Sequence, residues 1–333
     1  MVTVATWNLE NLYRPGGAFG PRTEEAYDKK LQALAATIDQ IRPDVLGVQE
    51  VGAPEALADL VDRLGGRWHT VLSGMPDGRG IRVGVLTRLE VQESTDVVEV
   101  PAALARVPTN DPPAVGPDIP DIPDIPDIPE PMLRLGRGIL HTRVATVSGA
   151  ALDVVVCHLK SKLITYPGNR FSPRDEGERA RYAAYALFRR TVEAASLRSW
   201  VNGLLDGRGT ERAVVVCGDL NNVPEAATTQ VLLGPAGSEI GTRAALTPDQ
   251  GDPWRLWNLA PLIPAERRFS RIFQGRRELI DHILISRALL ERVQAADALT
   301  DRPLPTVTEE PVRRRDAEDS DHAPVVARLD ISP

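Results

Sequence analysis

The chain of 333 residues is long enough for one or two domains, and its 42% hydrophobic and 26% charged residues are typical of a globular protein. No apolar stretch is long enough to cross a bilayer, and the N-terminal MVTVATWNLEN lacks the basic segment of a signal peptide, so we expect a cytoplasmic protein. The formal charge of −7 excludes a surface coated in positive charge, but it is compatible with a local basic site. Cys157 and Cys217 lie in Val-rich segments, where we expect packed thiols and no disulfide.

Segments typical of strands and helices recur from one end of the chain to the other. Residues 24–42 carry apolar side chains at steps of three and four, which predicts a helix that ends before Pro43. Further helices are predicted at 54–66, about 176–206 and 225–233, and strands at 2–6, 44–51, 82–89, 151–160, about 214–219, 278–286 and 323–329. Some strands are joined by helices and others by shorter links, which indicates a mixed α/β protein with sizeable sheets. We expect one domain over residues 1–333.

Residues 108–131 differ in composition from the rest of the chain. The segment has nine prolines, six acidic residues and no basic residue, and Asp-Ile-Pro occurs four times in succession. Proline fixes φ and removes a hydrogen-bond donor, so these triplets favour polyproline II. We interpret the segment as an inserted surface loop. One hypothesis is that its aspartates compete with an anionic substrate for a basic face of the protein. The simpler interpretation is an inert insertion.

Polar side chains gather at or near the ends of six predicted strands. They are Asn8 and Glu10, Glu50, His158 followed by Lys160 and Lys162, Asp219 and Asn221, Asp281, and the pair Asp321 and His322. Rigid strands fix side-chain geometry well, so the pattern predicts one shared site.

The residue types at these strand ends indicate a particular chemistry. Carboxylates and amides without Cys₄ or paired-His spacing suit a hard cation, Mg²⁺ first and Mn²⁺ as an alternative. Asp–His combinations can charge an imidazole for phosphate contact or proton transfer. Hydrolysis of a phosphate ester uses a hard cation, a base and cationic donors together.

Six short motifs occur in the order found in one known superfamily. TWNLEN, QE, HLKSK, GDLNN, IDHI and SDHAPV extend from Thr6 to Val325, and the chain therefore resembles the endonuclease/exonuclease/phosphatase superfamily of metal-dependent phosphoesterases. The resemblance implies an α+β fold, a four-layer α/β/β/α sandwich of two packed mixed β-sheets flanked by helices, with the site at one edge.

The resemblance also implies a set of metal ligands. Glu50 would be the principal Mg²⁺ ligand, with help from Asn8 and Glu10. Asp321 would lie close to the same cation.

The catalytic roles are implied in the same way. Asp219 would orient and deprotonate the attacking water, and Asn221 would hold water or phosphate in place. Asp281 would pair with His322, which would contact the scissile phosphate and stabilise developing charge. His158 would bind another phosphate oxygen.

The motifs do not determine which phosphate ester is the substrate. The apurinic-site branch usually has tyrosine where His158 stands, whereas pancreatic-type deoxyribonucleases share this histidine. Lipid and inositol branches often have a second histidine where this chain has Lys162. We therefore expect a nuclease acting on DNA. The alternatives are a phosphatase or phosphodiesterase on a small-molecule, inositol or lipid phosphate, and a non-catalytic binding scaffold.

Two arginine-rich stretches are candidates for substrate contact. Residues 255–277 hold six arginines against one acidic residue, with aromatic residues between them, and residues 167–181 form the second stretch. Guanidinium groups and aromatic faces are what a nucleic-acid strand uses for phosphate contact and stacking. A solvated face over core aromatics fits the first stretch equally well. The expected substrate contacts are Lys160, Lys162, Arg170 and Arg271.

Overall fold

The computed structural model describes residues 1–107, 132–164, 166–167, 170, 172–235, 237–300, 302–308 and 314–331. The segment 108–131, interpreted above as an inserted loop, lies outside the described residues. In the described part of the chain, no helix combines the length and apolarity that crossing a membrane would need.

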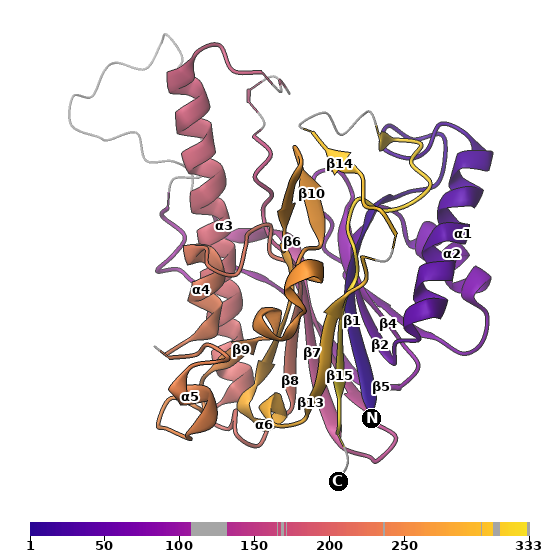
Figure 1. Cartoon of the computed structure of the whole chain (residues 1–333). Coiled ribbons are helices and arrows are strands. Elements are labelled where there is room, and N and C mark those ends of the chain that lie inside the picture. Colours follow the sequence, from indigo (N-terminus) through magenta and orange to yellow (C-terminus); the bar gives the residue numbers. More distant parts are fainter. Residues whose placement is uncertain are drawn as a thin grey trace, which may run out of the picture.

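Two six-stranded sheets pack face to face, and helices cover both outer faces (Figure 1). The first sheet has the order β13 (Val293–Ala298), β15 (Val325–Leu329), β1 (Val2–Leu12), β2 (Val45–Val51), β4 (Arg82–Thr87), β3 (His69–Leu72). The second has the order β5 (Glu90–Glu99), β6 (Arg134–Ala145), β7 (Ala151–His158), β8 (Val214–Asp219), β12 (Asp281–Ser286), β9 (Leu256–Asn258). A small sheet of β11 (Arg276–Glu278), β10 (Arg271–Phe273) and β14 (Thr306–Val307) stands at one end.

The helices form the outer layers of the sandwich. α1 (Glu24–Ile41) and α2 (Pro54–Leu64) cover the first sheet, and α3 (Glu176–Leu205) and α4 (Ala227–Leu233) cover the second. The short helices α5 (Arg243–Leu246) and α6 (Arg287–Leu290) and two 3₁₀ turns, Ala260–Leu262 and Ala265–Arg267, lie in the connections. The predicted α+β sandwich of four layers is confirmed.

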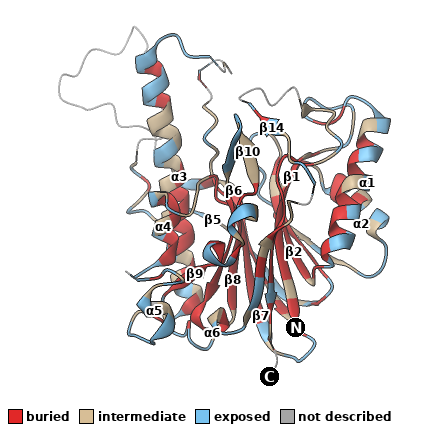
Figure 2. Ribbon diagram, in the orientation of Figure 1, coloured by how far each residue is buried: buried red, intermediate tan, exposed pale blue. Residues whose placement is uncertain are grey.

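Both faces of each sheet are buried (Figure 2), because the side chains of each strand point alternately to one face and to the other. On β7, Val154 and Val156 join the core between the two sheets, whereas Val155 and Cys157 face the core beneath α3. Successive side chains of a strand point to opposite faces, so a continuous Val-rich run serves two cores at once. Cys157 and Cys217 are both buried and free, as expected.

Local signals fix the ends of the two long helices. The Thr23 side chain accepts a hydrogen bond from the Ala26 N–H (3.1 Å), and the Asp175 side chain accepts one from the Glu178 N–H (2.8 Å). Such N-caps satisfy backbone donors that a helix leaves free. Both helices end at a residue in the left-handed region, Arg42 and Asp206. The predicted helices 24–42 and 176–206 are confirmed to within one residue.

Several predicted elements have other boundaries in the structure, among them β1 and α4. Strand β1 continues to Leu12, so Asn8 and Glu10 lie within it and do not follow it. Helix α4 begins at Ala227, because the Ala226 N–H bonds to the Val223 carbonyl (3.1 Å) in a separate turn. Pro224 therefore belongs to this turn and not to the first turn of the helix.

Candidate active site

A pocket of about 280 Å³ opens at the end of the sandwich beside the small sheet. Seven of the predicted residues line it together with Arg271: Glu10, Glu50, His158, Asp219, Asn221, Asp321 and His322. Asn8 and Asp281 lie directly behind this lining, because they contact Asp219 and His322. The strand ends picked out in the sequence therefore meet at one place.

An irregularity in the first sheet turns several of these side chains toward the pocket. The pairing of β1 with β2 shifts between Asn8 and Leu12. Glu10, Asn11 and Glu50 adopt positive φ values of 47°, 54° and 61°, and all three line the pocket. Asn221, on the opposite wall, also has positive φ. Bulges and left-handed residues are costly for side chains other than glycine, and they concentrate at functional sites.

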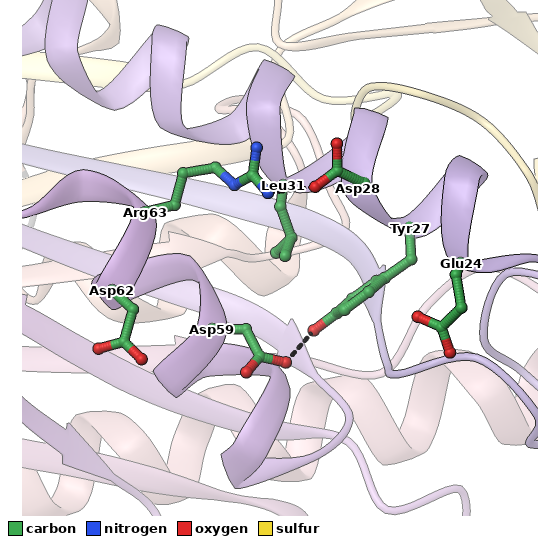
Figure 3. A pocket seen from close by; sticks show the side chains of 7 residues that line it. All are labelled: Glu24, Tyr27, Asp28, Leu31, Asp59, Asp62 and Arg63. Carbon is green, nitrogen blue, oxygen red and sulfur yellow. Dashed lines mark hydrogen bonds and ion pairs between the residues drawn. The ribbon is translucent and has the colours of Figure 1, made fainter.

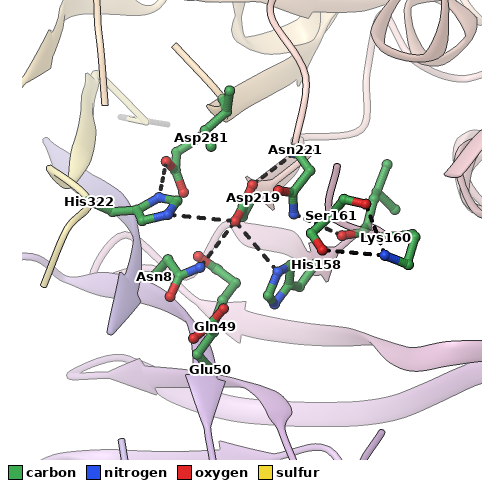
Figure 4. A network of polar contacts seen from close by, with 12 residues as sticks. Asn8, Gln49, Glu50, His158, Lys160, Ser161, Asp219, Asn221, Asp281 and His322 are labelled. Carbon is green, nitrogen blue, oxygen red and sulfur yellow. Dashed lines mark hydrogen bonds and ion pairs between the residues drawn. The ribbon is translucent and has the colours of Figure 1, made fainter. Parts of the chain in front are cut away.

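Strand register in the second sheet places Asp219 between two other polar residues. Asp219 pairs with His158 across the parallel β7–β8 ladder and with Asp281 across the antiparallel β8–β12 ladder. Its Oδ1 accepts from the Asn221 N–H (2.8 Å) and its Oδ2 from Asn8 Nδ2 (3.0 Å). This carboxylate is the centre of the polar network in Figure 4.

His322 approaches the same carboxylate from the first sheet. Its Nδ1 lies 2.7 Å from Asp281 Oδ2, and its Nε2 lies 4.0 Å from Asp219 Oδ2. Burial alone would lower the pKa of His322, but Asp281 and Asp321 outweigh burial and raise this pKa to about 10. His322 is thus an imidazolium at neutral pH, held by a carboxylate on one side and directed at the pocket on the other (Figure 4).

The pKa values of the other two central groups shift in ways that suit proton transfer. Burial and the nearby Asp281 raise the pKa of Asp219 to about 7, although His322 acts against them. A carboxylate with a pKa near neutrality can accept a proton from water at physiological pH. Burial, followed by Arg137, holds the pKa of His158 well below its usual value, so this ring is neutral. Its Nε2 lies 3.5 Å from Asp219 Oδ2.

The wall formed by β1 and β2 offers oxygen atoms that fit a hard cation. Glu50 lines the pocket and uses Oε2 to accept from the Asn11 N–H (2.9 Å), whereas its Oε1 has no hydrogen-bond partner among the described residues. The buried Asn11 Oδ1 has no hydrogen-bond partner in the described part of the chain. His322 and Arg271 help to lower the pKa of Asp321 against the effect of burial, which keeps Asp321 ionised. Carboxylate and amide oxygens are the donors that Mg²⁺ and Mn²⁺ prefer.

Two of the expected metal ligands are engaged elsewhere. Both oxygens of Glu10 accept from Arg314, at 2.6 Å each, and Glu10 Oε2 also accepts from the Asp321 N–H (2.9 Å). Asn8 donates from its Nδ2 to Asp219, and its Oδ1 accepts from the Glu10 N–H (2.9 Å). In this structure Glu10 positions Arg314, and Asn8 positions Asp219.

Among the described residues, two clusters of acidic and histidine side chains are compact enough to hold a metal ion. One consists of Asp219, Asp281 and His322. The positive charge of the His322 imidazolium would repel a metal cation there. The other consists of Glu93, His141 and Asp153 and lies outside the pocket. Arg143 already pairs there with Asp153 (2.8 Å), so a positive charge is in place. Asn11 on β1 and Glu50 on β2 have no arginine, lysine or histidine paired with their oxygens among the described residues, so this part of the pocket suits a cation better than either cluster.

Three of the four predicted substrate contacts do not line the pocket. Lys160 Nζ donates to the carbonyls of Ser161 (3.0 Å) and Leu163 (2.8 Å) and so ties down the loop after His158. Lys162 pairs with Glu278 (3.2 Å). Arg170 binds Glu178 at the start of α3 (2.7 Å). Arg271 is the exception, since it lines the pocket with its Nε 3.3 Å from Asp321 Oδ2.

The arginine-rich stretch 255–277 does not form one face. Arg255 is only 4% exposed and pairs with Asp252 (3.0 Å), and Trp257 is part of the core between the sheets. Arg276 and Arg277 are exposed on β11. Only the β10–β11 end of the stretch therefore remains available to a substrate.

Nine residues that line the pocket were not among the predicted site residues, and those with a charged or amide side chain are Asn11, Arg79, Arg137 and Arg314. Asn11 is the last residue of the TWNLEN motif, from which only Asn8 and Glu10 were predicted as site residues. The arginines come from loops and from the start of β6, where no spacing or motif marks them.

A larger hollow, of about 570 Å³, lies between α1 and α2 (Figure 3). Two of its four acidic residues are paired: Tyr27 Oη donates to Asp59 (2.8 Å), Arg14 also pairs with Asp59 (2.6 Å), and Arg63 pairs with Asp28. These contacts join α1 to α2. We therefore interpret the hollow as part of the packing between the two helices and propose no active site there.

Comparison with solved structures gives the same fold. A mannosyl-6-phosphatase from Bacteroides thetaiotaomicron superposes with a TM-score of 0.58 at 16% identity, covering 99% of this chain and 100% of that one. An AP endonuclease from Archaeoglobus fulgidus gives 0.54 at 16% identity, with coverage of 99% and 100%. A 3′-5′ exonuclease from Neisseria meningitidis gives 0.52 at 17% identity, with coverage of 98% and 99%. Identities this low establish a shared fold alone.

Comparison with the sequences of curated proteins gives no match. The model of the Endonuclease/Exonuclease/phosphatase family matches residues 5–322, which is nearly the whole chain. The matched range contains the irregularity between β1 and β2 and the His322–Asp281 pair described above. The chain belongs to the endonuclease/exonuclease/phosphatase family, whose members are hydrolases.

Proposed function

We propose that the protein is a Mg²⁺-dependent phosphodiesterase that cleaves DNA. The observation that carries the proposal is the line of three groups from Asp281 through His322 to Asp219 at the edge of the pocket. It joins an imidazolium, which can bind a phosphate oxygen, to a carboxylate whose pKa of about 7 suits a base. An intact line of this kind also argues against a non-catalytic scaffold.

In the proposed reaction, Asp219 accepts a proton from the water that attacks phosphorus, the P–O bond to the leaving alcohol breaks, and the alkoxide oxygen takes a proton from solvent. His322 donates to a non-bridging oxygen of the phosphate, where negative charge grows in the transition state. Asn221 and the neutral His158 hold the phosphate or the water in line. Asp281 fixes the orientation and the charge of the imidazole.

Glu50, Asp321 and the amide oxygen of Asn11 would hold the cation. When bound, it supplies Lewis-acid polarisation of the phosphoryl oxygen and neutralises part of the negative charge of the ester. Glu10 would contribute indirectly, because it holds Arg314 beside this wall.

Replacement of Glu50 by Gln tests the metal site. The change keeps the side-chain shape but removes the charge, so we expect the concentration of Mg²⁺ that gives half-maximal activity to rise at least about tenfold. Thermal unfolding should be unchanged, and EDTA should abolish the turnover of the wild-type protein. Glu93→Gln, in the cluster away from the pocket, is the matched control and should behave as wild type. Full activity in EDTA would contradict a metal mechanism.

A substrate panel tests the choice of DNA. Supercoiled plasmid, linear duplex and single-stranded DNA should be cleaved with Mg²⁺ or Mn²⁺, and inositol phosphates, sphingomyelin and hexose 6-phosphates should be hydrolysed poorly. The Asp219→Asn protein, prepared identically, controls for contaminating nucleases. Preferential hydrolysis of a hexose or inositol phosphate would replace the nuclease by a phosphatase acting at the same pocket.

A further inference from the structure

Two arginines that the proposed mechanism does not use line the pocket beside His158. Arg79 comes from the loop before β4 in the first sheet, and Arg137 comes from β6 in the second sheet. Both lower the pKa of His158, after burial, which places their charges close to its ring. The two guanidinium groups thus converge on the pocket from opposite sheets.

Asp77 joins the two arginines. Its Oδ1 accepts from the backbone N–H groups of Arg79 (2.8 Å) and Ile81 (3.0 Å), which fixes the loop. Its Oδ2 lies 3.1 Å from Arg137 Nε and 3.9 Å from Arg79 Nε. One carboxylate therefore faces two guanidinium groups, and one positive charge is left over.

Part of the hydrogen-bonding capacity of this pair is unused. Arg137 donates its Nη1 to the Leu159 carbonyl (3.4 Å), next to His158, and its Nη2 has no hydrogen-bond partner among the described residues. The Arg137 side chain is 11% exposed and lines the pocket. The side chain of Arg79, 38% exposed, meets the same carboxylate only at 3.9 Å. Guanidinium groups with free N–H donors are suited to phosphate oxygens.

The arginines on the other side of the pocket differ in this respect. Arg314 gives two hydrogen bonds to Glu10, and Arg271 lies against Asp321. Each of these two guanidinium groups therefore already lies against a carboxyl group of the protein. The uncompensated charge lies on the His158 side of the pocket.

We propose that Arg79 and Arg137, held together by Asp77, form a second anion subsite that binds a phosphate neighbouring the scissile one. The inference rests on the proposed function, and it narrows the substrate class to esters that carry two phosphates close together. A nucleic-acid strand offers such a pair in adjacent backbone phosphates, and a sugar bisphosphate offers another.

Binding to the Asp219→Asn protein tests the subsite without turnover. Calorimetry should give on the order of 10- to 100-fold tighter binding of pTpT or TpTp than of TpT, the effect of one added charged hydrogen-bonded contact. A second arm compares glucose 1,6-bisphosphate with glucose 6-phosphate. A preference confined to the dinucleotides assigns the second phosphate to a nucleic acid, whereas a preference confined to the sugars assigns it to a small bisphosphate.

The variants Arg79→Gln and Arg137→Gln should each reduce this preference to within a few-fold of unity, and Arg137→Lys should restore part of it. Arg143→Gln removes an arginine from the same strand, away from the pocket, and should keep the full preference. Equal affinity for singly and doubly phosphorylated ligands in the parent protein would overturn the subsite. The proposed function is judged separately, because it fails if the wild-type protein does not cleave DNA in the substrate panel.

Discussion

Replacement of Asp219 by Asn is expected to lower kcat by roughly 10²–10⁴-fold, the usual range for loss of a general base. Asn has nearly the same shape, and its amide oxygen can still accept the hydrogen bond that the Asn221 N–H now gives to Asp219. It cannot take a proton from water, so the substrate should still bind while hydrolysis slows. Single-turnover cleavage of a labelled duplex, with affinity measured in parallel, separates the two effects.

A matched control is available on the neighbouring strand. Asp153 is as buried as Asp219 but pairs with Val214 at the other end of the β7–β8 ladder. Asp153→Asn tests what loss of a buried carboxylate does to the fold alone, and its kcat should stay close to wild type. A decrease of less than a few-fold for Asp219→Asn would mean that another group accepts the proton.

The second large effect is expected at the imidazolium. His322→Ala removes the charge that faces the scissile phosphate, and loss of one preorganised donor to a developing negative charge lowers kcat by about 10²–10³-fold. Asp281→Asn should lower kcat in the same direction, because burial would then act on the pKa of His322 without its main opposing carboxylate. In the double variant the two losses should be far from additive, since both residues act through one imidazole.

The protein contains a second buried His–Asp pair that serves as the control. His141 Nε2 lies 2.8 Å from Asp153 Oδ1, against 2.7 Å for the His322–Asp281 pair, and it does not line the pocket. His141→Ala should lower the melting temperature with kcat unchanged. If His141→Ala and His322→Ala reduced kcat equally, the loss would reflect stability and not a role at the phosphate.

The sequence alone was sufficient for the fold class and for the acidic and histidine side chains that line the pocket. Val-rich runs with a polar residue at their ends predicted strands that deliver side chains to one edge, and the motifs named the family. Asp219, His158 and His322 lie together because strand ends are rigid and short side chains extend little beyond them. Strands such as β5 were missed, because half-exposed edge strands with charged residues lack the apolar alternation of central strands.

The direction of the long cationic side chains was decided only by the tertiary structure. Lys160, Lys162 and Arg170 stand near the motif histidine in sequence, yet carbonyls and carboxylates from the neighbouring loop, β11 and α3 draw them away from the pocket. Arg79 and Arg137 reach it from segments far from any motif. A long, flexible Lys or Arg side chain binds whichever acceptor the packing of the chain brings within reach. For several of these side chains that acceptor lies on a distant segment of the chain. The motifs and their spacing along the sequence therefore identified the acidic and histidine side chains at strand ends. The arrangement of the two sheets determined which Lys and Arg side chains reach the pocket.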